Sequence, residues 1–318
     1  MKKQKHIVTV GGGTGTFTLL RGLKKYPVRL TAVVSMADDG GSTGALRDQY
    51  GVLPPGDIRR ALVALSESSR GLRELFAFRF SKGDFHNHTF GNLFLAALEK
   101  ITGSFSEAID EASRILNVRG EVVPVTLDNV RLSARLADGH IIRGEHNIDV
   151  PKKGFSGAPI KEVWLSPKAK INPKAAKALR SADIIIIGPG DMYTSIIPNL
   201  LVSGVSQAIR RSKAKKVYVG SLMTKFGETH SFSAPDFISE IERYVGEGTL
   251  DVAVFNKKRP SPTALRRYAA KRSKFVDPSA LSRSSKKPRV LLADLLKEEN
   301  FLVRHDEKKL ARLLVSLL

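Results

Sequence analysis

Two segments of the chain run from a short apolar stretch through a glycine-rich turn into residues with helical spacing. Residues 6–10 are followed by the glycines of 11–15, and residues 182–187 are followed by Gly188-Pro189-Gly190. Both apolar stretches have the length and composition of buried parallel strands. Because strands and helices alternate along the chain, we predict an α/β fold on an open, mainly parallel, doubly wound sheet.

Each glycine turn also indicates a ligand. A turn of this kind places free backbone N–H groups and the positive end of a helix where a phosphate can bind. The first turn lacks the lysine of a Walker A loop, and Thr16 stands where a dinucleotide fingerprint has glycine or alanine. The turns therefore predict phosphate binding without assigning either motif.

A third segment, Ala37-Asp38-Asp39-Gly40-Gly41-Ser42-Thr43-Gly44, combines paired carboxylates, three glycines and two hydroxyls. Such a composition is atypical of helices and strands, so we expect a loop. It follows a predicted strand at residues 30–35, and ligands gather beyond the carboxyl ends of parallel strands. The two aspartates should therefore lie beside the first glycine turn, where they can hold a divalent cation or sugar hydroxyls. The sequence does not choose between these roles.

Several single polar residues have both a structural and a functional interpretation. Asp57 and Asn92 each stand at the start of a predicted helix, where they can cap the helix or contact a ligand. Asp191 is more simply a helix cap. Arg304 can point at an anion, and Asp306 should cap the terminal helix.

The composition limits the classes of partner. There are 52 lysines and arginines against 31 acids, a net charge of +21, and no cysteine. The charge favours anionic partners, and the lack of cysteine excludes disulfides, thiolate metal sites and a cysteine nucleophile. The densest basic segment, residues 257–289, has few aromatic residues, so nucleic-acid binding is not expected. Without a signal-peptide pattern or a long apolar run, we expect a cytoplasmic protein with no membrane span.

We expect one domain over residues 1–318, with two segments whose sequence pattern differs from the alternation of strands and helices. Residues 119–165 change to short strands separated by glycines, which predicts a β-rich, antiparallel insertion. Residues 257–289 form a basic variable segment, within which residues 260–288 are the best candidate for a linker or a variable loop.

Taken together, the motifs resemble one family over residues 7–318: the gluconeogenesis-factor branch of the CofD-like proteins, which are related to 2-phospho-L-lactate transferase. The motifs are Gly11-Gly12-Gly13-Thr14-Gly15, the segment 37–44, Pro54-Pro55-Gly56-Asp57-Ile58-Arg59, Gly91-Asn92-Leu93, Gly188-Pro189-Gly190 with residues 193–200, and Arg304-His305-Asp306. The resemblance implies a Rossmann-like core and a regulator of carbon metabolism and cell shape that binds a UDP-sugar. The alternative is a metal-dependent enzyme that transfers a phospholactyl group from a guanosine-diphospho donor.

The expected ligand is thus a UDP-sugar or another nucleotide-diphospho compound. The glycine turns should hold its diphosphate, while Asn92 and Arg304 bind sugar, base or charge. Asp38 and Asp39 are the candidate ligands for Mg²⁺, no organic cofactor is expected, and a homo-oligomer stays open. No residue stands out as a nucleophile, so none is assigned to catalysis. The full set of predicted ligand-binding residues is Gly11, Gly12, Gly13, Thr14, Gly15, Gly40, Gly41, Ser42, Asp57, Asn92, Gly188, Pro189, Gly190 and Arg304.

Overall fold

A parallel sheet of seven strands forms the centre of the computed structural model, which describes residues 4–152, 154–281 and 288–318. Its strand order is β10-β9-β8-β7-β1-β2-β3, and every neighbouring pair is parallel. This order confirms the predicted doubly wound α/β fold. The strands are β1 (His6–Gly11), β2 (Arg29–Val34), β3 (Glu121–Pro124), β7 (Ile184–Ile187), β8 (Lys215–Val219), β9 (Val252–Asn256) and β10 (Arg289–Ala293).

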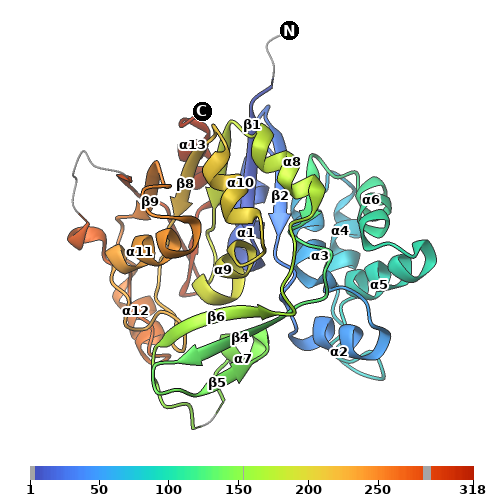
Figure 1. Cartoon of the computed structure of the whole chain (residues 1–318), viewed down its shortest axis with the longest axis horizontal. Coiled ribbons are helices and arrows are strands. Elements are labelled where there is room, and N and C mark those ends of the chain that lie inside the picture. Colours follow the sequence, from blue (N-terminus) through green and yellow to red (C-terminus); the bar gives the residue numbers. More distant parts are fainter. Residues whose placement is uncertain (1–3, 153, 282–287) are drawn as a thin grey trace.

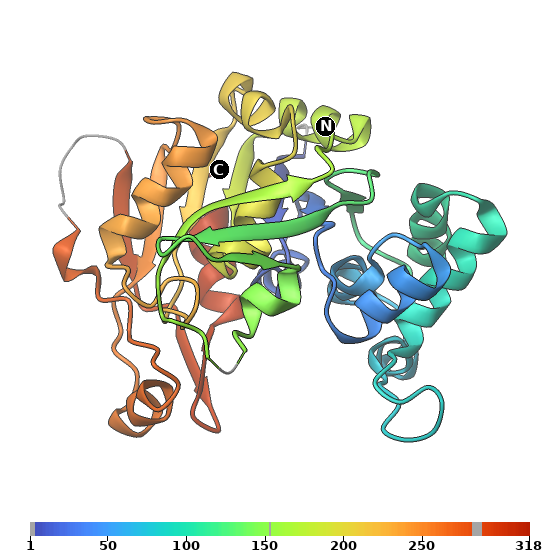
Figure 2. The same ribbon diagram turned by 60° about the horizontal axis from the view of Figure 1, so that its bottom comes forward.

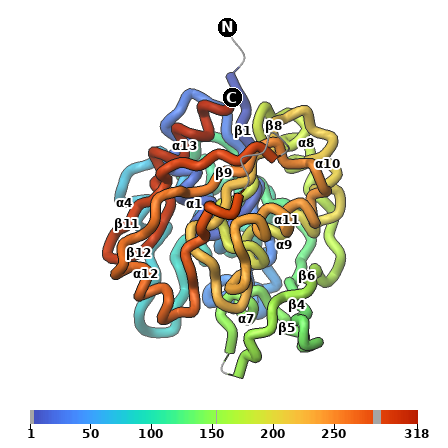
Figure 3. The backbone as a smooth tube through the Cα atoms, turned by 90° about the vertical axis from the view of Figure 1, so that its left-hand side faces the viewer, coloured from blue at the N-terminus to red at the C-terminus, as the bar shows by residue number. Residues whose placement is uncertain are grey.

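Helices cover both faces of this sheet (Figure 1). Figure 3 places α8 to α11 on one side of the strands and α1 with α13 on the other. Both central strands, β1 and β7, are buried along their length, as the continuous apolar runs predicted. The helices of the two faces are α1 (Gly13–Leu23), α3 (Pro55–Leu65) and α13 (Glu307–Val315), then α8 (Pro173–Ser181), α9 (Ile197–Leu200), α10 (Val205–Arg211) and α11 (Ala234–Val245).

Three further helices extend the domain beside α3, at the right of Figure 1. They are α4 (Arg70–Ala77), α5 (Phe90–Thr102) and α6 (Phe105–Ile115). The buried ring of Phe76 on α4 packs edge-on against the partly buried rings of Phe90 and Phe94 on α5, and the three ring centroids lie 5.0–6.1 Å apart. Among the described residues, no helix has the length and apolarity needed to cross a bilayer.

A small antiparallel sheet of order β5-β4-β6 lies at the end of the molecule that Figure 2 turns toward the viewer. It consists of β4 (Arg131–Leu136), β5 (Ile141–Arg143) and β6 (Ile160–Ser166), with the short helix α7 (Glu145–Asp149) following β5. The expected β-rich insertion over 119–165 is therefore not one unit: β3 pairs with β2 in the main sheet, and β4, β5 and β6 form the separate antiparallel sheet. A second antiparallel pair, β11 (Leu296–Glu299) and β12 (Leu302–His305), leads into α13.

The expectation of a loop throughout residues 37–44 is wrong for its second half, because α2 (Gly41–Tyr50) begins at Gly41. The Asp38 carboxylate accepts hydrogen bonds from the N–H of Gly40 and the hydroxyl of Thr43, at 3.0 and 2.9 Å. These bonds start the helix, and buried Leu46 anchors it. Gly41 has φ of +45°, a conformation that favours glycine.

The expectation of a linker over residues 260–288 is also wrong for its described part. This part contains α12 (Pro262–Ala269) and a short 3₁₀ helix, η2 (Pro278–Ala280). Ala264 is buried in a small cluster with Leu222, Leu296 and Val303, which holds α12 against the β11–β12 pair. The few apolar residues that anchor α12 are not evident in the sequence, because basic residues dominate this segment. Lys286 and Lys287 lie outside the described residues.

Candidate functional site

A cavity of about 580 Å³ opens at the carboxyl ends of β1 and β7. These two strands pair with each other, but the chain leaves β1 toward β2 on one side and β7 toward β8 on the other. Their helices diverge at this point, which is the usual ligand-binding position in open α/β sheets. The two glycine turns meet here, because a side chain at Gly15 would overlap the backbone of Pro189.

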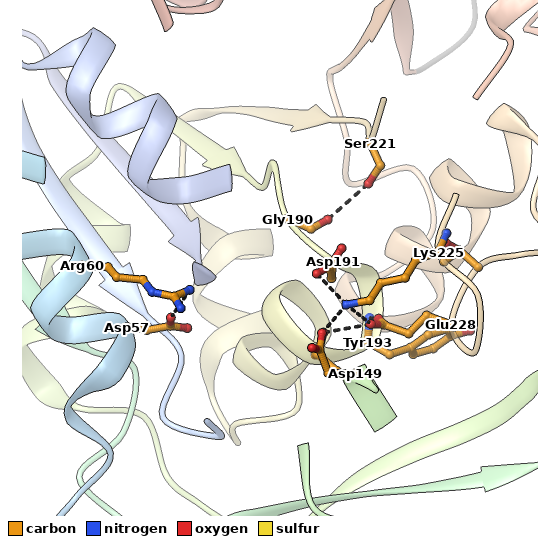
Figure 4. A network of polar contacts seen from close by, with 11 residues as sticks. Asp57, Arg60, Asp149, Gly190, Asp191, Tyr193, Ser221, Lys225 and Glu228 are labelled. Carbon is orange, nitrogen blue, oxygen red and sulfur yellow. Dashed lines mark hydrogen bonds and ion pairs between the residues drawn. The ribbon is translucent and has the colours of Figure 1, made fainter. Parts of the chain in front are cut away.

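Asp57 contacts the first glycine turn. Its carboxylate accepts a hydrogen bond from the backbone N–H of Gly13, and a Cβ at Gly12 would overlap it. Burial, followed by the nearby Asp38 carboxylate, raises the pKa of Asp57 to about 6, although Arg60 lies 3.7 Å away (Figure 4). The expectation that Asp57 caps α3 is wrong, because the helix begins at Pro55 and Asp57 lies within its first turn.

The paired aspartates point to different places. Asp38 lines the cavity, whereas Asp39 does not. Asp39 instead accepts a hydrogen bond from the backbone N–H of His146 at 2.8 Å and lies 3.6 Å from the Arg131 guanidinium. Beside the first glycine turn, the carboxylates on the cavity wall are therefore Asp38 and Asp57, whereas Asp39 connects the antiparallel insertion to the core.

Three buried polar side chains form a chain of hydrogen bonds along the cavity wall. Arg59 Nε donates to Asn92 Oδ1 at 2.9 Å, and Asn92 Nδ2 donates to Ser42 Oγ at 3.1 Å. Asn92 is not a helix cap, because α5 begins at Phe90 after Thr89. Burial lowers the pKa of Arg59 to about 10, so its guanidinium remains charged near neutrality. The chain holds this cation toward the cavity, where an anion can meet it.

The second glycine turn continues into a π-helical turn, η1 (Met192–Ile196), and then into α9. Asp191 occupies the N-cap position, but its side chain makes no capping hydrogen bond and instead pairs with Lys225 at 2.8 Å. The fully buried Glu228 takes over this role: it accepts from the backbone N–H of Tyr193 at 2.8 Å and the Thr194 hydroxyl at 3.0 Å. Burial raises the pKa of Glu228 to about 7, against the pull of Lys225.

The antiparallel insertion and the C-terminal hairpin supply two further titratable groups. Glu145, on α7, lines the cavity, and burial together with Asp38 and Asp149 raises its pKa to about 10. His305 lies beside Arg304 on β12, and both line the cavity. His305 is only 8% exposed, its Nε2 has no hydrogen-bond partner among the described residues, and burial lowers its pKa to about 4. The imidazole is therefore neutral at pH 7.

Acidic and basic side chains are equal in number on the cavity wall. Five aspartates or glutamates line the cavity, and so do five lysines or arginines. The acids are Asp38, Asp57, Glu145, Asp149 and Asp191, and the bases are Arg59, Arg60, Arg79, Lys225 and Arg304. An anionic ligand would meet carboxylates as well as cations, so a divalent ion bound with the ligand would favour binding.

Comparisons with known proteins agree with this architecture. A family model described as 2-phospho-L-lactate transferase CofD matches residues 7–296. The chain belongs to the CofD family.

Relatives of this CofD-family protein carry a second description. This chain is 48% identical to a putative gluconeogenesis factor of a Nostoc species, over 98% of this chain and 68% of the relative. It is 41% identical to the gluconeogenesis factor of Bacillus subtilis over 100% and 99% of the two chains. A crystal structure of a UPF0052-family protein from Bacillus halodurans superposes with a TM-score of 0.91 at 40% identity, covering 98% of this chain and 99% of that one.

The fold of this CofD-family protein brings most of the predicted site residues to one cavity. Those that line it are Gly13, Thr14, Gly15, Asp38, Gly40, Gly41, Ser42, Asp57, Asn92, Pro189, Gly190 and Arg304. Gly11, Gly12, Gly188 and Asp39 lie behind its surface. The sequence interpretation missed Glu145, Asp149, Lys225, Glu228 and His305. Only His305 belonged to a motif, and the other four stand in regions without a spacing that marks chemistry.

Proposed function

We propose that this protein binds a nucleotide sugar, with a UDP-sugar as the leading candidate, and acts as a regulator of carbon metabolism and cell shape. The observation that carries the proposal is the meeting of two glycine turns at the point where β1 and β7 diverge. The backbone N–H groups of Gly13 and Tyr193 are already bonded to Asp57 and Glu228, and we propose that the other N–H groups of the two turns bind a diphosphate. The relatives described as gluconeogenesis factors support a regulatory role.

The hard oxygen ligands of Asp38 and Asp57 suit Mg²⁺. Both carboxylates line the cavity, and each disfavours the charge of the other. A divalent ion between them and the ligand would relieve this repulsion and would neutralise phosphate charge. In this arrangement Asp57 holds the Gly13 backbone, Arg59 and Arg304 face the ligand, and the Asn92–Ser42 pair fixes Arg59.

Calorimetry with UDP-N-acetylglucosamine, GDP and NAD, each with and without Mg²⁺, tests the proposal. We expect UDP-N-acetylglucosamine to bind, and Arg304→Met to weaken this binding because one cavity cation is lost. Arg180→Met, an exposed arginine on α8, is the matched control and should bind like the wild type. Failure of all three compounds to bind the wild-type protein would refute the proposal.

A metal-dependent transferase is the second candidate. The match to the 2-phospho-L-lactate transferase family and the carboxylates of Asp38, Asp57 and Glu145 in one cavity favour it. Charge that develops on a transferred phosphoryl group would be stabilised by a metal ion on Asp38 and Asp57. This candidate predicts Mg²⁺-dependent GDP binding, together with transfer from a guanosine-diphospho donor that Asp57→Asn abolishes. Nucleotide binding without any transfer would favour the regulator.

A further inference from the structure

Lys225 lies at the centre of three carboxylates beside the second glycine turn (Figure 4). Its ammonium contacts Asp149, lies 2.8 Å from Asp191 Oδ2 and lies 3.2 Å from Glu228 Oε1. The three carboxylates offer oxygen atoms that all lie within 4.8 Å of one another. This spacing is small enough for one cation to contact all three, and the lysine ammonium does so.

An ammonium group has three N–H donors, and each of the three carboxylates can take one. The Lys225 ammonium donates hydrogen bonds to Asp149 and Asp191 and forms an ion pair with Glu228, so carboxylates already surround it although it lines the cavity wall. Its side chain is only 26% exposed, and that of Glu228 is fully buried. The neighbouring carboxylates, Glu228 first, raise the pKa of Lys225 far above its ordinary value against the effect of burial. Lys225 is thus a permanently charged internal cation rather than a direct phosphate ligand.

The three carboxylates come from separate parts of the fold. Asp149 ends α7 of the antiparallel insertion, Asp191 follows the second glycine turn, and Glu228 lies in the segment between β8 and α11. Glu228 also fixes the turn by accepting hydrogen bonds from Tyr193 and Thr194. Lys225 therefore joins the insertion, the glycine turn and the group that orients it.

Other contacts near Lys225 also join the insertion to the segment after β8. The rings of Phe155 and Phe226 meet edge-on with centroids 5.5 Å apart. A side chain at Gly227 would overlap the Pro151 ring, so these two stretches touch closely. His230 Nε2 makes a hydrogen bond with the carbonyl oxygen of Gly157 at 3.0 Å. The ion cluster therefore lies at an interface that is already held together by apolar and polar contacts.

We propose that Lys225 is a positioning residue that acts as a built-in substitute for a divalent cation, holding the second glycine turn and the antiparallel insertion in the geometry that binds the ligand. It acts through Asp191 and Glu228 and does not touch the ligand itself. Removing the ammonium leaves three carboxylates without it, of which Glu228 is fully buried, and a buried unpaired charge is strongly unfavourable. A divalent cation is the chemical species that best restores this balance, because carboxylate oxygens are its preferred ligands.

Lys225→Met is the test, because methionine fills much the same volume without charge. Electron paramagnetic resonance with Mn²⁺ should show one more bound ion per chain in the variant than in the wild type. Without divalent ions, affinity for UDP-N-acetylglucosamine should fall by about 10-fold to 100-fold, the range seen when supporting groups of a site are removed. Added Mn²⁺ should restore more affinity in the variant than it adds to the wild type. Lys213→Met, at an exposed lysine, is the matched control.

Two results would overturn the proposal. One is wild-type affinity of Lys225→Met in the absence of metal, and the other is a loss of affinity that no divalent ion restores. If Lys225→Met folds only with Mn²⁺, the proposal is supported. Failure to fold even with Mn²⁺ counts against it, provided that Lys225→Met combined with Glu228→Gln does fold. That double variant lacks the buried carboxylate and should bind no additional Mn²⁺.

The affinity measurement rests on the proposed function, whereas the Mn²⁺ count does not. If the wild type binds none of the three nucleotides, the proposed ligand class fails. The additional Mn²⁺ ion in Lys225→Met, together with a rise in melting temperature on its binding, still tests the role of Lys225. Failure of the inference and failure of the proposed function are therefore distinguishable.

Discussion

The buried carboxylate of Asp57 should make the protein less stable as the pH rises. Its pKa is raised from 3.8 to about 6 in the folded protein, so the folded state binds this proton more tightly than the unfolded state. The contribution to stability is fully present below about pH 4 and is lost as the pH rises through about 6. The difference between these pKa values corresponds to about 3 kcal/mol in the free energy of unfolding.

Asp57→Asn removes this titration while keeping the size of the side chain and an oxygen that can accept from Gly13. The free energy of unfolding of the variant, minus that of the wild type, should therefore increase by about 3 kcal/mol between pH 4 and pH 8. Urea unfolding followed by circular dichroism at a series of pH values, with EDTA present, measures this change. A constant offset from altered packing cancels because only the change with pH is used, and the effect of Arg60 is already part of the shifted pKa of Asp57.

A difference that does not vary with pH would refute the assignment of a raised pKa to Asp57. Asp110→Asn, at an exposed carboxylate on α6, controls for the general effect of removing a negative charge. Repeating the series in Mg²⁺ tests the proposed metal site as well. A cation bound to Asp38 and Asp57 would favour the charged carboxylate, so the change with pH should shrink.

Three other substitutions have defined outcomes. Gly12→Ala places a Cβ against the Asp57 carboxylate, and it should lower stability by about 1–3 kcal/mol in urea unfolding and weaken nucleotide binding in calorimetry. Because the pKa of His305 is lowered to about 4, its titration should contribute a loss of about 3 kcal/mol as the pH falls from 6.5 to 4, so the free energy of unfolding of the wild type minus that of His305→Gln should fall by about this amount. Arg47→Met leaves the carbonyl oxygens of Asp38 and Val130 without this donor, so the free energy of unfolding measured in urea should fall by about 1–3 kcal/mol for each oxygen.

The sheet and the adjacency of the two glycine turns can be read from the sequence. Residues 184–187 are four consecutive isoleucines that suit only a buried environment, and the glycines after them mark where the strand ends. In a parallel sheet such ends lie at one edge, so the turns at Gly15 and Pro189 had to come close. Local pattern and topology together determine this part of the site.

Side-chain direction could not be read in the same way. Asp38 and Asp39 are neighbours, yet the first lines the cavity and the second contacts the insertion. Which carboxylate turns inward depends on donors from Thr43 and His146, and His146 lies 107 residues beyond Asp39. The Lys225 cluster is also non-local, because Asp149 lies 76 residues before Lys225. The spacing of residues along the chain therefore cannot predict such contacts.

The large positive charge of the chain does not describe its site. The net charge is +21, but the cavity wall holds five acidic side chains and five lysines or arginines, and one of these cations, Lys225, already contacts three carboxylates. Most of the excess charge therefore lies on the outer surface, where it can attract an anionic ligand over a distance of about one Debye length. In the proposed binding mode, backbone N–H groups, the remaining arginines and a divalent ion on Asp38 and Asp57 hold the diphosphate inside the cavity. Under this proposal, net charge bears on the rate of encounter, while retention depends on the glycine turns and the metal.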